Sequence, residues 1–191
     1  MEDLAEKKQA IFESTLDLIK DHGFHGAPMS LVAKHAGVAA GTIYHYFESK
    51  EQLICELYAY NRARVTATIK AALNDGNDYK AKFFNVWTSL YSFYVKEPNV
   101  LIFFEQFVNS PFSSDKYPSH FRGDLYAFFA DGIKQGIIRP LKPEILLVLV
   151  MGSINSTAKL NVFGKVAVTK PDVLRIAETV WDGISAKGKE N

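Results

Sequence analysis

Histidine and cysteine are the side chains here that could support metal or covalent chemistry, and both are sparse. His22 and His25 form the only close histidine pair. They straddle Gly23, which takes them off a regular helix face, and they lack a third ligand, so no metal site is expected. Cys55 is the single cysteine and lies in a helical pattern with Leu53 and Leu57. This setting favours a packed thiol over a redox sensor.

Motifs that would support catalysis are also missing from the sequence. It contains no nucleophile elbow, no P-loop, no Rossmann fingerprint and no HExxH helix. The sequence therefore predicts neither an enzyme nor a cofactor, and an uncharacterised enzyme is the least favoured alternative.

The most informative stretch runs from Ser30 to Leu53, where two short helical patterns flank a glycine. Gly37 suits a tight turn between two steeply crossing helices, and Ala33 lets them approach closely. Val38 and Ile43 can fill the small core between the helices. The exposed face of the second helix would then fit a major groove about 12 Å wide, which is the geometry of a helix-turn-helix.

This segment resembles the TetR family of bacterial transcriptional regulators in twelve positions over about 20 residues. The matching positions are Val32, Ala33, Ala36, Gly37, Val38, Gly41, Ile43, Tyr44, Tyr46, Phe47, Lys50 and Leu53. The resemblance is strong over residues 8–60. Beyond them it rests on helix count and length and on the Ile138-Arg139-Pro140 break.

The resemblance implies DNA-binding roles for residues around the second short helix. These residues are Ser30, Ala40, Gly41, Thr42, Tyr44, His45, Tyr46 and Lys50. Tyr44 and Lys50 would bind phosphates, whereas Thr42 and His45 would reach base edges. Gly41 would let the backbone approach the bases. Tyr46 could equally be a packing aromatic.

The predicted reading head is poorly capped and lightly charged. Ala39 and Ala40 stand where the family often has a capping Ser or Thr followed by a polar or basic residue, and an alanine cap is weak. Residues 1–75 carry 8 Lys+Arg against 10 Asp+Glu, although the chain has a net charge of +1. The case for DNA binding therefore rests on local geometry rather than on bulk charge.

Helical periodicity and Gly or Pro breaks predict an all-α fold of about nine helices. The expected helices span 4–22, 28–35, 39–46, 49–73, 79–95, 98–108, 118–136, 143–163 and 170–186. Ser49 and Gln52 have the spacing of a capping box. We expect a helix-turn-helix domain over 1–50, linked by helix 49–73 to a ligand-sensing and dimerisation domain over 51–191.

Aromatic residues crowd the predicted C-terminal domain, and most of them must form its core. Ligand pockets are also apolar with a few polar groups, and the family resemblance implies one here. The predicted lining is Trp87, Tyr91, Phe103, Phe104, Gln106, Phe107, Tyr126, Phe129, Ile133, Met151 and Asn155, with Asn85 and Lys159 as further polar candidates.

The last two helices look like the dimerisation pair of the family. The predicted interface is Ile145, Leu149, Gly152, Ser153, Ser156, Leu160, Val173, Ile176, Val180 and Ile184. A four-helix bundle about a twofold axis would let two heads read half-sites of a pseudo-palindromic operator together.

The expected function is that of a repressor released from DNA by a small, largely apolar or aromatic effector. The alternative is a DNA-binding regulator that needs no ligand. The longest unbroken apolar run, Ile145 to Met151, is too short to cross a membrane, and residues 1–8 are charged. These features predict a cytoplasmic protein with no membrane partner.

Overall fold

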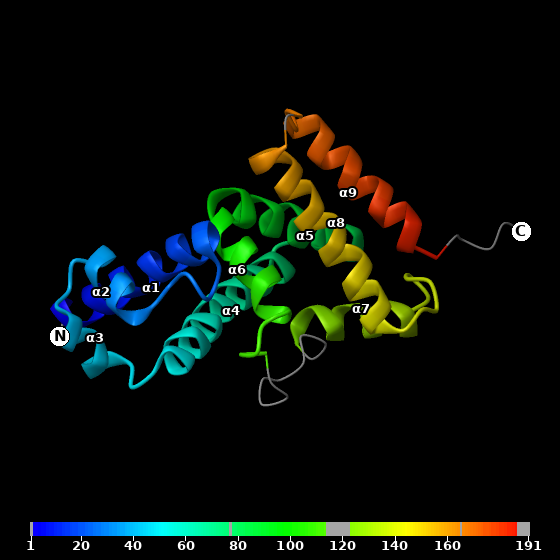
Figure 1. The fold of residues 1–191 in the computed structure, drawn as a ribbon. Helices are drawn as coiled ribbons and strands as arrows, with labels where there is room; N and C mark the ends of the chain where they lie inside the picture. The colour runs from blue at the N-terminus through cyan, green and yellow to red at the C-terminus, as the bar shows by residue number, and fades with distance from the viewer. Residues whose placement is uncertain (1, 77, 114–122, 165, 187–191) are drawn as a thin grey trace, which may run out of the picture. The chain divides into compact units, whose positions relative to one another are not determined.

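The computed structural model describes residues 2–76, 78–113, 123–164 and 166–186. Over these ranges it is all-α, as predicted, with nine helices (Figure 1). They are α1 (Glu2–His22), α2 (Met29–His35), α3 (Ala40–Tyr46), α4 (Lys50–Asn74), α5 (Tyr79–Lys96), α6 (Pro98–Val108), α7 (Asp124–Lys134), α8 (Pro143–Phe163) and α9 (Lys170–Ile184).

Most helix bounds agree with the sequence prediction to within two residues, but α7 is shorter at both ends. Its predicted start at 118 lies outside the described residues. Within them, Gly123 is the N-cap and Asp124 the first helical residue. The helix ends at Lys134 instead of 136 because Gly136 adopts a φ of +71°, which is incompatible with a right-handed helix.

The chain divides into two compact units that do not follow the sequence in order. Unit 1 comprises residues 1–63 and 99–114, and unit 2 comprises 64–98 and 115–191. Unit 1 therefore contains α1, α2, α3, the first half of α4 and also α6. Its core is built from fully buried side chains at helical spacing, among them Ile11, Ile19, Val32, Ile43, Phe47 and Leu57.

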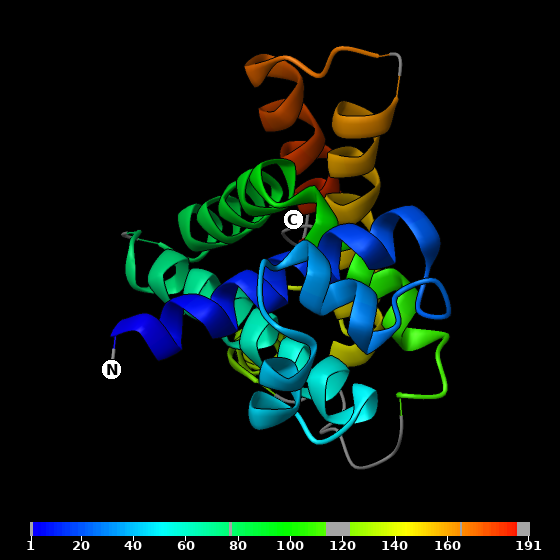
Figure 2. The same ribbon diagram turned by 60° about the vertical axis from the view of Figure 1, so that its left-hand side comes forward.

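Unit 2 is centred on α5, which packs mainly against α8 and also against α9, while α7 packs against α8. Helices α8 and α9 lie side by side, as Figures 1 and 2 both show. Trp87, Leu90, Phe129 and Ile154 are fully buried in this unit. The aromatic residues of the sequence thus form a core, as the helical pattern requires.

The described residues contain no strand, in agreement with the sequence, but they include one isolated antiparallel bridge between Ile138 and Ser185. The Arg139 amide donates to the Ile184 carbonyl at 2.8 Å, and the Ala186 amide donates to the Ile137 carbonyl at 2.8 Å. These bonds explain why α9 ends at Ile184, two residues before the predicted end.

Helix α8 is long and apolar enough to cross a membrane by length and composition alone, with a mean hydropathy of 1.5 over its most apolar window. Gly152, Ser153, Asn155 and Ser156 interrupt its apolar residues, so the sequence shows no unbroken apolar run of that length. One such helix is weak evidence for a membrane, because the core helix of a soluble protein passes the same test.

Candidate DNA-reading interface

The α2–turn–α3 segment has the geometry of a helix-turn-helix. Gly37 adopts a φ of +69°, which glycine reaches without strain, and the Val38 amide donates to the Ala33 carbonyl at 3.0 Å. The exposed fraction of Ala33 and of Ile43 is at most 1%, so the two helices pack closely together. Val38 is only half-buried. The packing roles predicted for Ala33, Gly37 and Ile43 are confirmed.

Neither of the two short helices has a side-chain cap. Pro28 is the N-cap of α2 with extended backbone rather than its first helical residue, because its ψ of 151° lies outside the helical range. Ala39 is the N-cap of α3, and its methyl group accepts no hydrogen bond. The weak cap predicted from the sequence is therefore present, and α3 depends on packing for its stability.

Most of the predicted DNA-binding residues are accessible on unit 1. Tyr44 is 55% exposed, the largest exposure of any aromatic residue in the described chain. The other exposed residues of the set are Ser30, Ala40, Gly41 and His45, whereas Thr42, Tyr46 and Lys50 are half-buried. The ring of Tyr46 lies 6.4 Å from that of Phe47, which supports a partial packing role.

The local structure does not require glycine at position 41, where Gly41 stands. It lies inside α3, its φ is not positive, and a Cβ atom built there would have no heavy atom within 4 Å. A glycine within a helix is less stable than an alanine by about 0.5–1 kcal/mol. The missing side chain thus costs stability and leaves bare backbone facing outward.

Lys50, the first residue of α4, is engaged within the protein. Its ammonium donates a hydrogen bond to the backbone carbonyl of Phe24, near the start of the α1–α2 connection. Burial lowers the pKa of the Lys50 ammonium below its usual value. This contact ties the start of α4 to the chain after α1, and it uses one of the three donors of the ammonium group.

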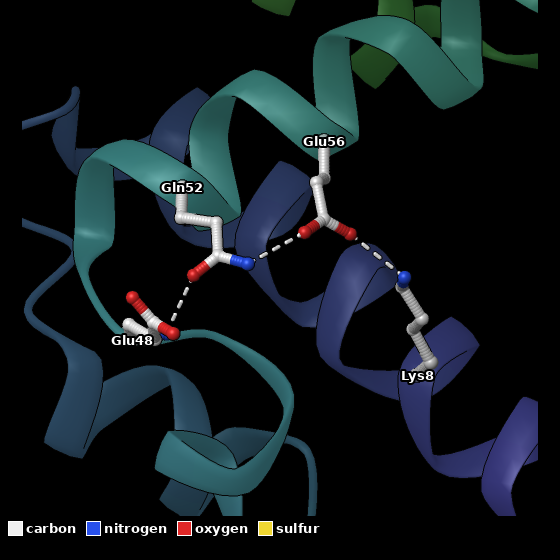
Figure 3. A network of polar contacts seen from close by, with 4 residues as sticks. All are labelled: Lys8, Glu48, Gln52 and Glu56. Carbon is white, nitrogen blue, oxygen red and sulfur yellow. Dashed lines mark hydrogen bonds and ion pairs between the residues drawn. The ribbon is translucent and has the colours of Figure 1, made fainter.

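A polar network that the sequence analysis did not predict joins α1 to the start of α4 (Figure 3). Lys8 pairs with Glu56 at 2.7 Å, the Gln52 amide nitrogen donates to Glu56 at 2.9 Å, and the Glu48 backbone amide donates to Gln52 at 2.7 Å. Gln52 and Glu56 are four residues apart on one helix, and this spacing in the sequence could have predicted their contact. Lys8 and Glu56 are 48 positions apart, so no local spacing in the sequence predicts their contact.

The network also corrects the predicted capping box. The Gln52 backbone amide donates to the Ser49 hydroxyl at 3.1 Å, which confirms Ser49 as the cap. In a capping box the Gln52 side chain would accept from the Ser49 backbone amide. Here it accepts from the backbone amide of Glu48, the residue before the cap. Because Glu56 holds the other end of the Gln52 amide, the cap and the α1 contact form one connected network (Figure 3).

The predicted ligand-lining residues fall in both units. Phe103, Phe104, Gln106 and Phe107 belong to α6 in unit 1, and the other seven belong to unit 2. On α6, the Phe107 ring stacks on Tyr58 at 4.2 Å, and the Gln106 amide donates to the Ile19 carbonyl at 3.2 Å. These side chains therefore take part in the packing of α6 against α1 and α4.

Within unit 2, Trp87 and Tyr91 form a stacked pair with ring centroids 5.8 Å apart. The Trp87 indole donates to the Ser153 hydroxyl at 3.0 Å, and burial raises the pKa of Tyr91. The buried Oδ1 of Asn155 has no hydrogen-bond partner in the described part of the chain. A separate open depression is lined by Asp78, Lys80, Ala81, Phe84 and Glu178, none of which was predicted to bind ligand.

The predicted dimer residues divide between an exposed face and the core of unit 2. The exposed members are Ile145, Leu149, Gly152, Ser156 and Leu160, all on α8. Val173 and Ile184 are buried, Ile176 and Val180 are half-buried, and the Ser153 hydroxyl is bonded to Trp87. Sequence analysis missed the exposed Val148, Phe163 and Leu174. The first two continue the helical spacing of the α8 face and could have been found.

Residues 11–57 match the family model described as bacterial regulatory proteins, tetR family, and residues 60–186 match that of the tetracyclin repressor-like C-terminal domain. The chain belongs to the TetR family. It is thus a DNA-binding transcriptional regulator, and its fold and its relatives are those of regulators rather than enzymes.

Other transcriptional regulators resemble this chain over nearly its whole length. An uncharacterized HTH-type transcriptional regulator of Haemophilus influenzae is 32% identical, covering 95% of this chain and 96% of its own. A TetR-family regulator from Marinobacter aquaeolei has a TM-score of 0.92 at 22% identity, covering 97% and 99% of the two chains. FadR of Bacillus subtilis, solved in complex with stearoyl-CoA, has a TM-score of 0.65 at 21% identity, covering 91% and 95%.

Proposed function

We propose that this TetR-family protein is a homodimeric repressor, acting in the cytoplasm, that leaves its operator when a small, largely apolar or aromatic effector binds. The observation that carries the DNA-binding part is the outer face of α3. There Tyr44 and His45 are exposed and Gly41 presents bare backbone, with no packing reason for any of the three. Residues 1–50 would read DNA, and 51–191 would sense the effector and dimerise.

In this proposal each residue of the predicted DNA-binding set has a role. The Tyr44 phenol donates to a phosphate, and Lys50 offers its remaining ammonium donors to a second phosphate. Thr42 and His45 contact base edges in the major groove. Gly41 allows α3 to lie closer to the DNA than a residue with a side chain would permit. Ser30, Ala40 and Tyr46 complete the contact surface.

The exposed apolar face of α8 supports the homodimer. Val148 is 60% exposed and Leu149 is 51% exposed. Exposed apolar surface is unfavourable in water, and a second copy packed against α8 would bury it. Gly152 on the same helix and Gly183 on α9 have no heavy atom within 4 Å of an added Cβ. Exposed helical glycines with free space around them permit a neighbouring helix to approach closely.

Two features of unit 2 support an apolar effector. Its interior is built from aromatic rings such as Trp87 and Tyr91, which suit an apolar ligand. The unpartnered Oδ1 of Asn155 could accept a hydrogen bond from a ligand, since a buried acceptor without a partner costs about 1–3 kcal/mol. FadR of Bacillus subtilis, which holds stearoyl-CoA, is a precedent for an acyl ligand within this fold.

Fluorescence anisotropy with a labelled duplex from the DNA upstream of the gene tests the reading face. Tyr44→Phe removes one phenol per subunit and should weaken binding by about tenfold or more, as expected for hydrogen bonds to a charged group. Tyr60→Phe is the matched control, because Tyr60 is also exposed in unit 1 but lies on α4, and it should bind as the wild type. Equal affinities for Tyr44→Phe and wild type would refute the assignment.

The effector is tested on the same complex. Native mass spectrometry of protein purified without denaturant should show a bound small molecule, and an organic extract of the host cells should release the labelled duplex. Asn155→Leu, which removes the acceptor and keeps the volume similar, should weaken release but not DNA binding. Indifference to every extract, together with a ligand-free mass, would favour the alternative of a ligand-independent regulator.

A further inference from the structure

Helix α3, which carries the proposed reading face, is short and weakly held at its beginning. Of its seven residues only Ile43 is buried, its N-cap Ala39 forms no side-chain hydrogen bond, and Gly41 lies in its first turn. A helix of two turns is marginal without packing, because few backbone hydrogen bonds offset its unfavourable nucleation. The orientation of α3 must therefore depend on the residues that follow it.

The C-terminal end of α3 is attached through Phe47 and Glu48. Phe47 is the C-cap, with an extended backbone at φ −141° and ψ 114°, and its amide donates to the Ile43 carbonyl at 3.0 Å. The Phe47 ring is fully buried. The Glu48 backbone amide donates to the Gln52 side chain at 2.7 Å. The exit from α3 is therefore fixed at one residue by a ring and at the next by a backbone amide.

Lys8 of α1 reaches both of these attachments. Its ammonium lies 5.5 Å from the centre of the Phe47 ring and 5.7 Å from that of Phe12, within the range of cation–π attraction. The same ammonium pairs with Glu56 at 2.7 Å, and Glu56 accepts from the Gln52 amide nitrogen at 2.9 Å (Figure 3). Lys8 thus contacts the ring directly and reaches the amide attachment through Glu56 and Gln52.

We propose that Lys8 is a positioning residue that sets how the C-terminal end of α3 is presented to DNA. It acts on Phe47 directly and on the backbone after it through the polar chain that begins at Glu56. All of these residues belong to unit 1. Because Glu56 neutralises the ammonium, Lys8 orients the polar side chains of α3 instead of binding phosphate itself. The effect on DNA affinity rests on the proposed function, in which α3 reads the operator.

The exposure of the ion pair separates positioning from overall stability. The Lys8 and Glu56 side chains are 42% and 36% exposed, and pairs this accessible contribute little to the free energy of unfolding. Loss of the pair should leave unit 1 folded but allow α3 a wider range of orientations. Affinity for the operator then falls, because only a fraction of the molecules holds α3 in the orientation that binds.

A direct contact between Lys8 and a phosphate is the competing role, and removal of the partner charge distinguishes the two. Glu56→Gln leaves an uncharged side chain of similar shape. If Lys8 bound phosphate, loss of the competing carboxylate would strengthen DNA binding. If Lys8 positions α3, the same substitution weakens its connection to the polar chain, and specific affinity should fall by about threefold, as expected for an accessible ion pair.

Fluorescence anisotropy compares the labelled upstream duplex with a random duplex of the same length at several salt concentrations. Lys8→Met keeps a side chain of similar length without the charge. It should lower affinity for the upstream duplex by about tenfold, as expected when an ion pair and two cation–π contacts are lost together. Affinity for the random duplex and the slope of log K against log[salt] should not change, because no phosphate contact is lost. Lys8→Arg keeps the charge and should recover most of the affinity.

A control variant and a measurement without DNA make the result specific. Lys20→Met is the matched control, because Lys20 lies on the same helix and pairs with its neighbour Asp21 at 3.7 Å. It should bind both duplexes as the wild type does. Amide hydrogen exchange over residues 44–48 should be about fivefold faster in Lys8→Met, since local opening follows the loss of local contacts. Urea titrations should show nearly unchanged stability in every variant.

Three outcomes would contradict these expectations in different ways. Wild-type affinity and exchange in Lys8→Met would overturn the positioning role. An equal loss of affinity for both duplexes with a shallower salt slope would also overturn it, because that combination indicates a phosphate contact. A wild-type protein that binds both duplexes alike would contradict the proposed function instead, and faster exchange over residues 44–48 in Lys8→Met would then still support the attachment of α3 by Lys8.

Discussion

At the scale of single residues, the reading face that we propose is defined as much by missing side chains as by present ones. Ala39, Ala40 and Gly41 follow one another, so the start of α3 offers little bulk and no cap. Tyr44 and His45 then supply the polar groups. The family resemblance assigned DNA-contacting roles to these residues, and those roles stay predictions. It did not show that Lys50 is bonded to the Phe24 carbonyl, a contact across 26 positions.

Gly41 allows stability and binding to be separated. Gly41→Ala places a methyl group in open space within a helix, so the free energy of unfolding should rise by about 0.5 kcal/mol in urea titrations. DNA affinity should fall, because the methyl group keeps α3 away from the duplex. Gly37→Ala is the control and should change the stability in the opposite direction. Because the φ of Gly37 is +69°, alanine would be strained there, and the free energy of unfolding should fall by about 1 kcal/mol. Undiminished DNA affinity in Gly41→Ala would remove the functional reason for this glycine.

At the scale of elements, glycine and proline breaks predicted where most helices begin and end, since these residues act on the local backbone. Membership of the compact units was not predictable in this way. Helix α6 lies between α5 and α7 in sequence but belongs to unit 1, through contacts such as Phe107 on Tyr58 and Asn99 on Asp17. Such contacts join positions far apart in the chain, and helical periodicity carries no information about partners.

The uncapped start of α3 gives a prediction at this scale. Ala39→Ser supplies a hydroxyl at the N-cap, where the backbone is already extended, and should stabilise the protein by about 1 kcal/mol. Ala40→Ser adds the same hydroxyl one residue later, inside the helix, and should give no such gain. Chemical denaturation of the three proteins measures the difference. Equal gains from both substitutions would show that the hydroxyl acts by some means other than capping.

At the scale of the whole molecule, the isolated chain leaves an apolar helix face exposed. The sequence predicted most of this face from small and bulky residues at helical spacing on α8. It could not show that Val173 and Ile184 of α9 turn inward, because both helices have apolar positions on more than one side. The dimer surface we propose is therefore centred on α8, with Val148 and Phe163 added to the residues expected from the pattern.

Sedimentation at micromolar concentration tests this surface. The wild type should sediment as a species of twice the 21.4 kDa chain mass. Leu149→Arg places a charge in the centre of the α8 face and should yield the monomer, since an unpaired buried charge costs several kcal/mol. Ser92→Arg adds the same charge at an exposed position of α5 and should remain dimeric. A wild-type protein of about 21 kDa would refute the dimer.

The acidic balance of residues 1–75, together with the engagement of Lys50 by the Phe24 carbonyl, bears on how the protein finds its site in a cell. Contacts with phosphates supply nearly all of the affinity for arbitrary DNA, and few cations are free here to make them. We therefore expect the protein to stay only briefly on random chromosome sequence, with little of it held there. Occupancy of the proposed operator should then follow the concentration of free protein, with little buffering by non-specific DNA.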